Sequence, residues 1–372
     1  APLILDRSTL VRALDELPHE QRDLLERVRD RIERFARAQR SSLVDLDLPL
    51  PGGSAGHQFV PVDVAGCYAP GGRFPLPSSV LMTATTARVA CVPQVIVSTP
   101  RPGVLMLAAA ALAGADAVLA EGGAQAIAAL ALGVDGLPAA DVVCGPGNRF
   151  VTAAKKLLAG EVSIDMLAGP SELLVLADDS ADPDLVAADL LGQAEHDEDA
   201  RVTLVALAAP RLAQRVRNAL HAQLAAHPSP GTAIAALQHG RAVEVASEHD
   251  ALELCDRLAP EHLQICVREP RGWRERLRHC GAVFSGTAGA EVFGDYGVGP
   301  NHVLPTGGAA RHSGGLSVLH FLRMRTWLHL DTADPGMVED TDALAALEGL
   351  HGHAAAARLR RGSTPQASHA RP

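Results

Sequence analysis

The side chains best suited to chemistry lie in the segment Gly192-Gln193-Ala194-Glu195-His196-Asp197. It ends an apolar stretch of helical spacing that begins with Asp182 as an N-cap and Pro183 in the first turn. Gln193 and His196 are three residues apart, so they should project from one helix face, toward protein. Two interpretations remain open for this pair. It is either a hydrogen-bonded core histidine beside a polar helix end, or part of a metal site in which imidazole and oxygen ligands bind a cation such as zinc.

Three further segments combine carboxylates with imidazoles. Glu261 and His262 are adjacent, between the end of a predicted helix and a strand predicted over residues 263–267. At such a turn both side chains can reach one pocket, although a salt bridge at the helix end would also explain the pair. The glycine-rich loop 294–302 contains Asp295 and His302. Glu348 and His353 lie in an alanine-rich helical stretch, where a surface helix explains either residue alone.

The elements that must position these residues follow an α/β pattern. Short β-rich runs alternate with helical runs, which implies parallel sheets covered by helices. We therefore predict an α/β fold with two incomplete Rossmann-like lobes, over residues 61–170 and 171–315. Strands are expected at 62–68, 95–98, 117–120, 141–144, 173–177, 202–206 and 263–267, and helices at 78–90, 104–113, 124–132 and 150–158.

The two ends of the chain are predicted to be helical. Residues 1–60 should form an N-terminal arm, with a charged amphipathic helical region over 8–40 and a boundary at the turn-forming residues 49–54. Residues 316–372 should form a C-terminal helical tail with a helix over 316–328 and a disordered end. The arm residues expected to face inward are Leu10, Leu14, Leu24, Leu25, Val28 and Ile32.

Two loops at predicted strand ends suit an anionic ligand. Gly145-Pro146-Gly147-Asn148 lies between a strand and a helix start but lacks the third glycine of the dinucleotide fingerprint. Backbone N–H groups and the helix dipole there could receive anionic oxygens. A tight turn with Asn148 as helix cap explains the same residues. Residues 68–72 occupy a similar strand end, and ligands of open α/β sheets bind at such carboxyl ends.

Composition excludes several classes of protein. The 372-residue chain is 47% hydrophobic and 20% charged, which is typical of a globular protein. A net charge of −10 gives no basic footprint, so we expect neither a nucleic acid nor a membrane as partner. The cysteines are scattered without a Cys-x-x-Cys pair, and the chain start carries no secretory signal. These features predict a cytoplasmic location with free thiols.

Several blocks together resemble the histidinol dehydrogenase family. The resemblance extends from about Tyr68 to His353, and the order and combination of its blocks are highly specific. It implies an NAD-dependent, zinc-containing enzyme that oxidises L-histidinol through L-histidinal to L-histidine, the last steps of histidine biosynthesis. The blocks are Gly123-Ala124-Gln125-Ala126-Ile127-Ala128, Gly145-Pro146-Gly147-Asn148, Ala168-Gly169-Pro170-Ser171-Glu172, Gln193-Ala194-Glu195-His196, Pro260-Glu261-His262 and Gly299-Pro300-Asn301-His302-Val303-Leu304-Pro305.

The same resemblance implies roles for individual residues. His262 would accept the hydroxyl proton of the alcohol, and Glu261 would activate the water added to the aldehyde. One zinc ion (Zn²⁺) per site would bind the substrate, and the tail would reach the active site of the other subunit of a homodimer. The implied zinc ligands are Gln193, His196, Asp295 and His353. Implied substrate contacts are Ser171, Gln193, His196, His262, Asp295, Glu348 and His353, and implied NAD contacts are Tyr68, Gln125 and Asn148.

Two alternatives remain open. One is a dehydrogenase of the same family that acts on another small hydroxyl compound, such as a sulfonated propanediol. The other is a catalytically silent metal-binding homologue. The presence of Glu261 and His262 argues against a silent homologue, and Glu348, which would bind the histidinol amine, favours histidinol.

Overall fold

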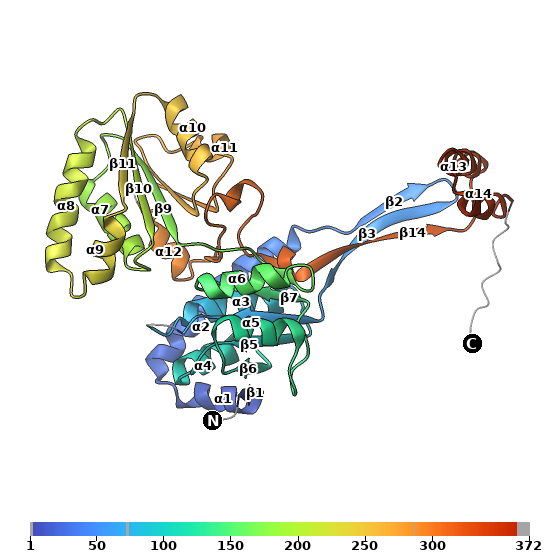
Figure 1. Cartoon of the computed structure of the whole chain (residues 1–372), viewed down its shortest axis with the longest axis horizontal. Coiled ribbons are helices and arrows are strands. Elements are labelled where there is room, and N and C mark those ends of the chain that lie inside the picture. Colours follow the sequence, from blue (N-terminus) through green and yellow to red (C-terminus); the bar gives the residue numbers. More distant parts are fainter. Residues whose placement is uncertain (1–2, 72–73, 287, 363–372) are drawn as a thin grey trace. The chain divides into compact units, whose positions relative to one another are not determined.

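The computed structural model describes residues 3–71, 74–286 and 288–362, and the chain forms two compact units. Unit 1 comprises Ala1–Arg40 and Val62–Phe321, and unit 2 comprises Ser41–Pro61 and Leu322–Pro372. Unit 1 contains two mainly parallel sheets with their helices, which confirms the predicted α/β fold with two Rossmann-like lobes (Figure 1). The predicted disordered end lies largely outside the described residues.

The first sheet has the strand order β1-β6-β5-β4-β7-β8, in which only β1 runs antiparallel to its neighbour. The chain leaves β4 toward β5 on one side and later returns to β7 on the other, which makes the β4/β7 boundary a topological switch point. The strands are β1 (Ile4–Asp6), β4 (Val64–Tyr68), β5 (Gln94–Ser98), β6 (Ala117–Leu119), β7 (Val142–Cys144) and β8 (Ser163–Ile164).

Helices cover the first sheet because each presents an apolar face to it. Ile127 and Leu130 of α5 pack with Val151 of α6 against strand residues such as Ile96 and Val143. Each such side chain contributes roughly 1.5–3 kcal/mol on full burial. Helices α3 and α4 pack against each other, and α1 packs against α4. The helices are α1 (Arg7–Glu16), α2 (His19–Ser41), α3 (Pro77–Val89), α4 (Val104–Leu112), α5 (Gly123–Leu132) and α6 (Arg149–Leu158).

The second sheet is wholly parallel, with the order β11-β10-β9-β12-β13. Alternation along β9 (Glu172–Ala177) sends Leu173 and Val175 into one core, beneath α7–α9, and Leu174 and Leu176 into another, beneath α10. The remaining elements are β10 (Arg201–Leu207), β11 (Arg241–Val245), β12 (His262–Cys266), β13 (Ala282–Ser285), α7 (Pro183–Ala194), α8 (Leu212–Ala226), α9 (Gly231–Leu237), α10 (Glu248–Leu258), α11 (Trp273–Arg276), α12 (Glu291–Asp295), η1 (Ala309–Arg311) and η2 (Val318–Phe321).

Unit 2 combines a three-stranded antiparallel sheet with two helices. Its strand order is β14-β3-β2, formed by β2 (Leu46–Leu50), β3 (Gly53–Pro61) and β14 (Leu322–Leu330). The predicted boundary at residues 49–54 is the tight turn between β2 and β3, where Gly52 has φ +84°. The helices are α13 (Pro335–Leu347) and α14 (His351–Arg358).

Three predictions about local structure are wrong. The helix predicted over 316–328 is largely strand β14, because residues 322–328 pair with β3 and that long-range pairing overrides local helical spacing. Residues 46–50 and 53–60 of the predicted N-terminal arm form strands β2 and β3, because β3 pairs with both β2 and β14. Leu24, expected to face inward, is 51% exposed, whereas Leu10, Leu25 and Ile32 are buried as predicted.

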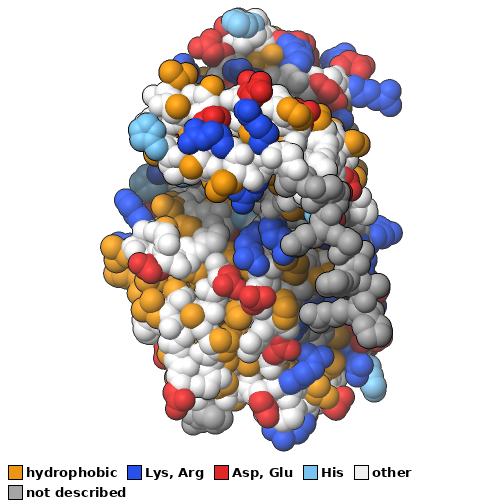
Figure 2. Space-filling view, turned by 90° about the vertical axis from the view of Figure 1, so that its right-hand side faces the viewer, with side chains coloured by type: hydrophobic (Ala, Val, Ile, Leu, Met, Phe, Trp, Pro, Cys, Tyr) orange, Lys and Arg blue, Asp and Glu red, His pale blue; other side chains and the backbone are white. Residues whose placement is uncertain are grey.

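The surface and the cysteines agree with the composition. Acidic and basic side chains are interspersed with apolar ones on the face in Figure 2. All six cysteines are free. Within the described ranges, none of the helices has both the length and the apolar character that a membrane span requires.

Candidate active site

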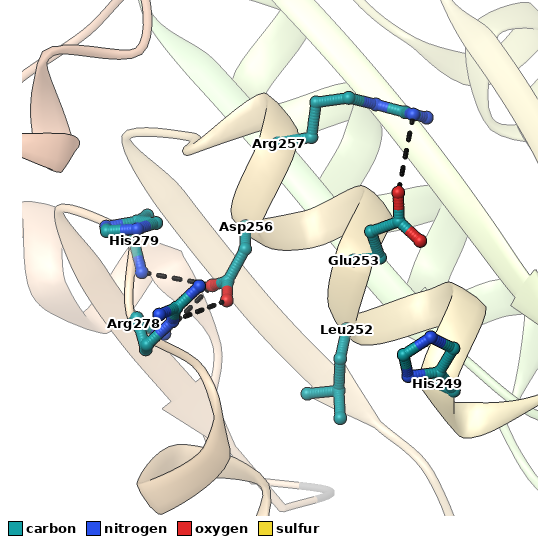
Figure 3. A pocket seen from close by; sticks show the side chains of 7 residues that line it. All are labelled: His249, Leu252, Glu253, Asp256, Arg257, Arg278 and His279. Atoms are coloured by element: carbon teal, nitrogen blue, oxygen red, sulfur yellow. Dashed lines mark hydrogen bonds and ion pairs between the residues drawn. The ribbon is translucent and has the colours of Figure 1, made fainter.

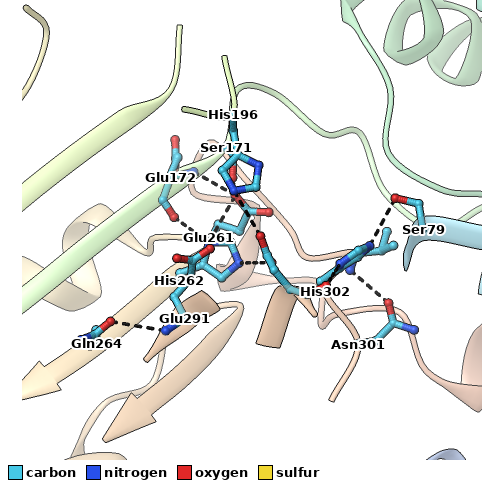
Figure 4. Close-up of polar contacts among 12 residues, drawn as sticks. Ser79, Ser171, Glu172, His196, Glu261, His262, Gln264, Glu291, Asn301 and His302 are labelled. Atoms are coloured by element: carbon cyan, nitrogen blue, oxygen red, sulfur yellow. Dashed lines mark hydrogen bonds and ion pairs between the residues drawn. The ribbon is translucent and has the colours of Figure 1, made fainter. Parts of the chain in front are cut away.

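The catalytic candidates lie at the amino edge of the second sheet. Glu172 is the first residue of β9 and His262 the first residue of the neighbouring β12, so the residues just before these strands lie side by side. Ala259 adopts a left-handed conformation (φ 47°) that ends α10 and turns the chain toward β12. Glu261 therefore lies between a helix and a strand as predicted, whereas His262 is already the first residue of the strand (Figure 4).

Glu261 is a buried carboxyl group with two donors on one oxygen. Its Oε2 accepts hydrogen bonds from the Ser171 hydroxyl at 2.7 Å and from the Glu172 backbone N–H at 2.8 Å. Burial raises its pKa to about 8, because desolvation of the carboxylate outweighs the lowering effect of these two hydrogen bonds. A carboxyl group with that pKa can take up and release a proton near neutral pH.

His262 is a buried neutral imidazole with one free nitrogen. Its Nδ1 lies 3.0 Å from the Glu172 carbonyl oxygen, so Nδ1 carries the hydrogen and donates it. Its Nε2 is buried and lacks a hydrogen-bond partner among the described residues. Burial lowers the pKa of His262 to about 4, which keeps the ring neutral and leaves the Nε2 lone pair available as a base.

A group of three potential metal ligands lies beside this pair. One ligand atom each from His196, Glu291 and Asp295 lies within 4.8 Å of the others. His196 Nε2 is 3.2 Å from Asp295 Oδ2. Burial raises the pKa of Asp295, but hydrogen bonding to His196 and the nearby imidazoles outweigh it and bring the pKa to about 2. The hydrogen bond to Asp295 raises the pKa of His196 in turn.

Gln193, three residues before His196, supplies an independent sign of a bound ligand. Its side chain is 0% exposed, yet neither the amide oxygen nor the amide nitrogen has a hydrogen-bond partner within the described part of the chain. An unpaired buried amide costs about 1–3 kcal/mol, which a metal ion bound by its oxygen would recover. Imidazole, carboxylate and amide oxygen without thiolate form a donor set that suits zinc, so these residues fit the implied metal.

The structure corrects two details of the sequence prediction. His196 follows the end of α7, and its side chain is 41% exposed, so it faces an open site, whereas Gln193 points into protein as expected. Asp295 is the last residue of the short helix α12 and not part of an irregular loop.

Glu291 is the functional candidate that sequence reasoning missed. It precedes Asp295 by one helical turn, is 3% exposed, and has an Oε1 without a partner among the residues described. Burial, and then the charge of Asp295, raise the pKa of Glu291 to about 8. The signal that could have found it is the i, i+4 spacing of two carboxylates.

His302 links the two lobes next to the metal-ligand cluster. Its Nδ1 lies 3.0 Å from the Asp295 carbonyl oxygen, and its Nε2 lies 3.4 Å from the hydroxyl of Ser79, on α3 of the first lobe (Figure 4). The neighbouring Asn301 donates its amide N–H to the Met82 carbonyl of the same helix at 2.9 Å. The segment after Asp295 is therefore held against the first lobe.

The predicted cofactor contacts lie at the carboxyl edge of the first sheet. Tyr68 ends β4, and its hydroxyl accepts a hydrogen bond from the backbone N–H of Gly123 at the start of α5. Asn148 caps α6 through its Oδ1, which accepts from two backbone N–H groups, as the turn interpretation predicted. Gln125 lies in the first turn of α5, where its amide contacts Glu121.

Glu348 and His353 belong to unit 2. Glu348 caps the end of α13 and His353 lies in α14, which confirms that both are in helical segments. Both side chains are exposed.

One surface pocket lies away from these residues. A depression of about 410 Å³ is lined by α10 and the chain before β13 (Figure 3). Its charged groups satisfy one another: Asp256 accepts hydrogen bonds from the backbone N–H groups of Arg278 and His279, and Arg257 faces Glu253. It includes none of the predicted site residues, so we assign the chemistry to the second-sheet edge.

The chain matches the histidinol dehydrogenase family over residues 2–361 and belongs to that family of NAD-dependent oxidoreductases. It is 43% identical to the histidinol dehydrogenase of Parasynechococcus marenigrum over 96% of this chain and 83% of that protein. It is also 42% identical to a protein of Ruegeria pomeroyi that is named a histidinol dehydrogenase homolog, over 96% of this chain and 85% of that protein.

Solved structures agree with this assignment. The crystal structure of histidinol dehydrogenase from Elizabethkingia anophelis gives a TM-score of 0.90 at 31% identity, covering 97% of this chain and 84% of that chain. Betaine aldehyde dehydrogenase from Staphylococcus aureus gives a TM-score of 0.55 at 12% identity, covering 87% of this chain and 82% of that chain, which shows a likeness of fold alone.

Proposed function

We propose that this protein oxidises L-histidinol through L-histidinal to L-histidine, using NAD and one zinc ion per site. The buried amide of Gln193 lacks a hydrogen-bond partner in the described residues. The observation that carries this proposal is that two differently tuned proton carriers, Glu261 and His262, lie beside the metal-ligand cluster, with His262 Nε2 3.9 Å from Asp295 Oδ1. A silent metal-binding homologue would not need such a pair beside its metal ligands.

Gln193, His196 and Asp295 would hold the zinc ion, together with His353. When bound, zinc would orient the imidazole and amino groups of the substrate without carrying electrons. Ser171 would then contact the substrate while its hydroxyl donates to Glu261. Substrate contacts are also proposed for Glu348, which would pair with the amino group.

The acid–base work follows from the state of each side chain. His262 is neutral with a free Nε2, so it accepts the hydroxyl proton as the alcohol is oxidised. The second oxidation begins with water adding to the aldehyde, and Glu261 takes the proton from that water. Ser171 and the Glu172 N–H stabilise the carboxylate form of Glu261 at the moment when it must act as a base.

The cofactor is proposed to lie along the carboxyl edge of the first sheet. Tyr68, Gln125 and Asn148 would contact it there, near the switch point between β4 and β7. When bound there, NAD would supply the hydride acceptor that each of the two oxidation steps requires. The exposed Nδ2 of Asn148 remains available to the cofactor because its Oδ1 caps α6.

The stoichiometry of the reaction tests the proposal. Purified protein with limiting L-histidinol and excess NAD should form two NADH per histidinol. One NADH would indicate a simple alcohol oxidation, and none would indicate a binding protein. The same assay should include sulfonated propanediols, because the alternative of another small hydroxyl substrate within the family remains to be tested. A faster reaction with those diols would overturn the assignment of histidinol.

We further propose that the working unit is a homodimer with shared sites, in which Glu348 and His353 complete the site of the partner. Unit 2 exposes apolar side chains that suit burial in such an interface: Leu347 is 85% exposed and Leu344 is 60% exposed. Mixing a His353→Ala protein with a His262→Asn protein should restore activity toward half of wild type per mixed dimer. No recovery despite demonstrated subunit exchange would mean that each chain supplies its own tail residues.

A further inference from the structure

A buried ion pair lies beneath the proposed cofactor loop. Lys155 Nζ and Asp165 Oδ1 are 2.6 Å apart, with side chains only 3% and 0% exposed. Removing two charges from water carries a large desolvation penalty, and well-packed apolar residues often stabilise a fold equally well. The pair is therefore weak evidence for stability, and its contacts point to a different role.

Those contacts hold both polar groups of one glycine. Lys155 Nζ donates to the Gly145 carbonyl oxygen at 2.6 Å, and the Gly145 N–H donates to Asp165 Oδ2 at 2.8 Å. Gly145 has φ +115°, and a Cβ at this position would lie 1.9 Å from the Tyr68 carbonyl oxygen. The ion pair thus fixes a strained backbone position that only glycine tolerates, between Tyr68 and Asn148.

The same ion pair also contacts the segment that leads to Glu261. Asp165 Oδ1 also accepts the Met166 N–H at 2.7 Å, at the start of the segment 165–171 that joins the lobes. One turn before Lys155 on α6, the Thr152 hydroxyl donates to the Ala168 carbonyl at 2.7 Å. This segment ends at Ser171, whose hydroxyl donates to Glu261. Helix α6 therefore holds the cofactor loop and the segment leading to Glu261 together.

We propose that Lys155 and Asp165 are a positioning pair that fixes the Gly145–Asn148 loop for NAD. Helix α6 sets the spacing between this loop and Glu261 through the segment 165–171. The inference rests on the proposed cofactor edge and assigns no catalytic contact to either residue. Removing the pair should loosen the loop and weaken NAD binding while leaving the metal ligands in place.

The test compares NAD affinity in matched variants. A Lys155→Met/Asp165→Asn double variant removes both charges, so neither is left buried and unpaired. Calorimetry without substrate should show NAD affinity reduced at least about tenfold, because loop ordering now opposes binding. Zinc content should equal that of wild type. Lys156→Met, at the exposed neighbouring lysine of α6, should change neither quantity.

A second variant separates the two parts of the proposal. Thr152→Val removes only the contact to Ala168, so the rate of histidinal oxidation should fall several-fold with unchanged NAD affinity. Wild-type NAD affinity in the folded double variant would overturn the role of the ion pair. Unchanged histidinal oxidation in Thr152→Val would overturn the link to Glu261. A wild-type protein that fails to bind NAD would overturn the proposed function itself.

Discussion

The candidate residues of the two lobes lie at opposite edges of their sheets, and the two edges have opposite polarity. In the first lobe, Tyr68 and Asn148 follow strand carboxyl ends, where the N-termini of α5 and α6 present backbone N–H groups. In the second lobe, Glu261 precedes β12 and His262 begins it. The carboxyl end of α7, which includes Gln193, presents backbone carbonyl groups. Helix N-termini favour anions and C-termini favour cations. One edge therefore suits a pyrophosphate and the other a metal ion.

The buried polar groups of the two lobes also differ in whether they have hydrogen-bond partners. Beneath the first edge, Lys155 and Asp165 satisfy each other and the backbone. At the second edge, the amide of Gln193 and the ionisable side chains of His262 and Glu291 have buried atoms without a hydrogen-bond partner in the described residues, whereas in the first lobe the described groups in this state are the hydroxyls of Thr85 and Thr99. Satisfied groups hold a backbone in place, whereas unsatisfied groups are retained where a ligand completes them. Four variants test this contrast.

The largest effect is expected from removing a cation ligand. His196→Ala should lose zinc and reduce histidinol oxidation on the order of 1000-fold, while NAD affinity stays unchanged. Atomic absorption would measure the zinc content, and calorimetry would measure the NAD affinity. His249→Ala, at an exposed histidine of the pocket in Figure 3, is the matched control and should retain zinc and activity. Full zinc occupancy in His196→Ala would contradict the assignment of the metal site to the amino edge of the second sheet.

The next largest effect separates the two proton carriers. His262→Asn should slow alcohol oxidation by about 100-fold or more, because it removes the base for the hydroxyl proton. Glu261→Gln should mainly slow oxidation of supplied histidinal, because only that step needs an activated water. Stopped-flow measurement of each half-reaction would distinguish them. If both variants lose both half-reactions equally, the division of labour is wrong.

The proposal that the carboxyl edge of the first sheet binds the anionic cofactor can be tested by adding one negative charge there. Asn148→Asp keeps the oxygen that caps α6, so the melting temperature should hardly change. The new carboxylate should repel the cofactor, raising the KM for NAD about 30-fold, equivalent to about 2 kcal/mol. Asp182→Asn exchanges the cap of α7 in the other lobe and should leave this KM unchanged. An unaltered KM in Asn148→Asp would place the cofactor elsewhere.

The smallest expected effect is a pH dependence. Burial raises the pKa of Glu261 to about 8, so the fraction of carboxylate able to accept a proton increases as pH rises through that value. Initial rates of histidinal oxidation should therefore rise about tenfold from pH 7 to pH 9. Glu261→Gln should lose this dependence. The same rise in the variant would assign it to another group.

The sequence predicted the two mainly parallel sheets of unit 1 better than it predicted unit 2. Alternating apolar runs identified β4, β9 and their helices because local periodicity and burial agree there. The strand pairing of β3 with β14 joins residues about 270 positions apart, and nothing local in the helical spacing of 316–328 reveals it.

The candidate site likewise combines residues that the sequence indicated with residues whose role depends on contacts made by the fold. Spacing alone paired Gln193 with His196, and the ligand positions implied by the family resemblance supplied Asp295. Glu291 was missed because its role depends on burial beside Asp295, which sequence does not display. The tuning of Glu261 and His262 in opposite directions also depends on desolvation and on Ser171 and Glu172, which come from a distant strand.

The central claim, that the amino edge of the second sheet binds zinc through nitrogen and oxygen, is tested most directly by X-ray absorption at the zinc edge. The zinc-loaded protein should show nitrogen and oxygen neighbours at about 2.0–2.2 Å and none at about 2.3 Å, the zinc–sulfur distance. The imidazole contribution should decrease in His196→Ala protein reconstituted with excess zinc. A sulfur neighbour, or an unchanged spectrum in that variant, would contradict the account.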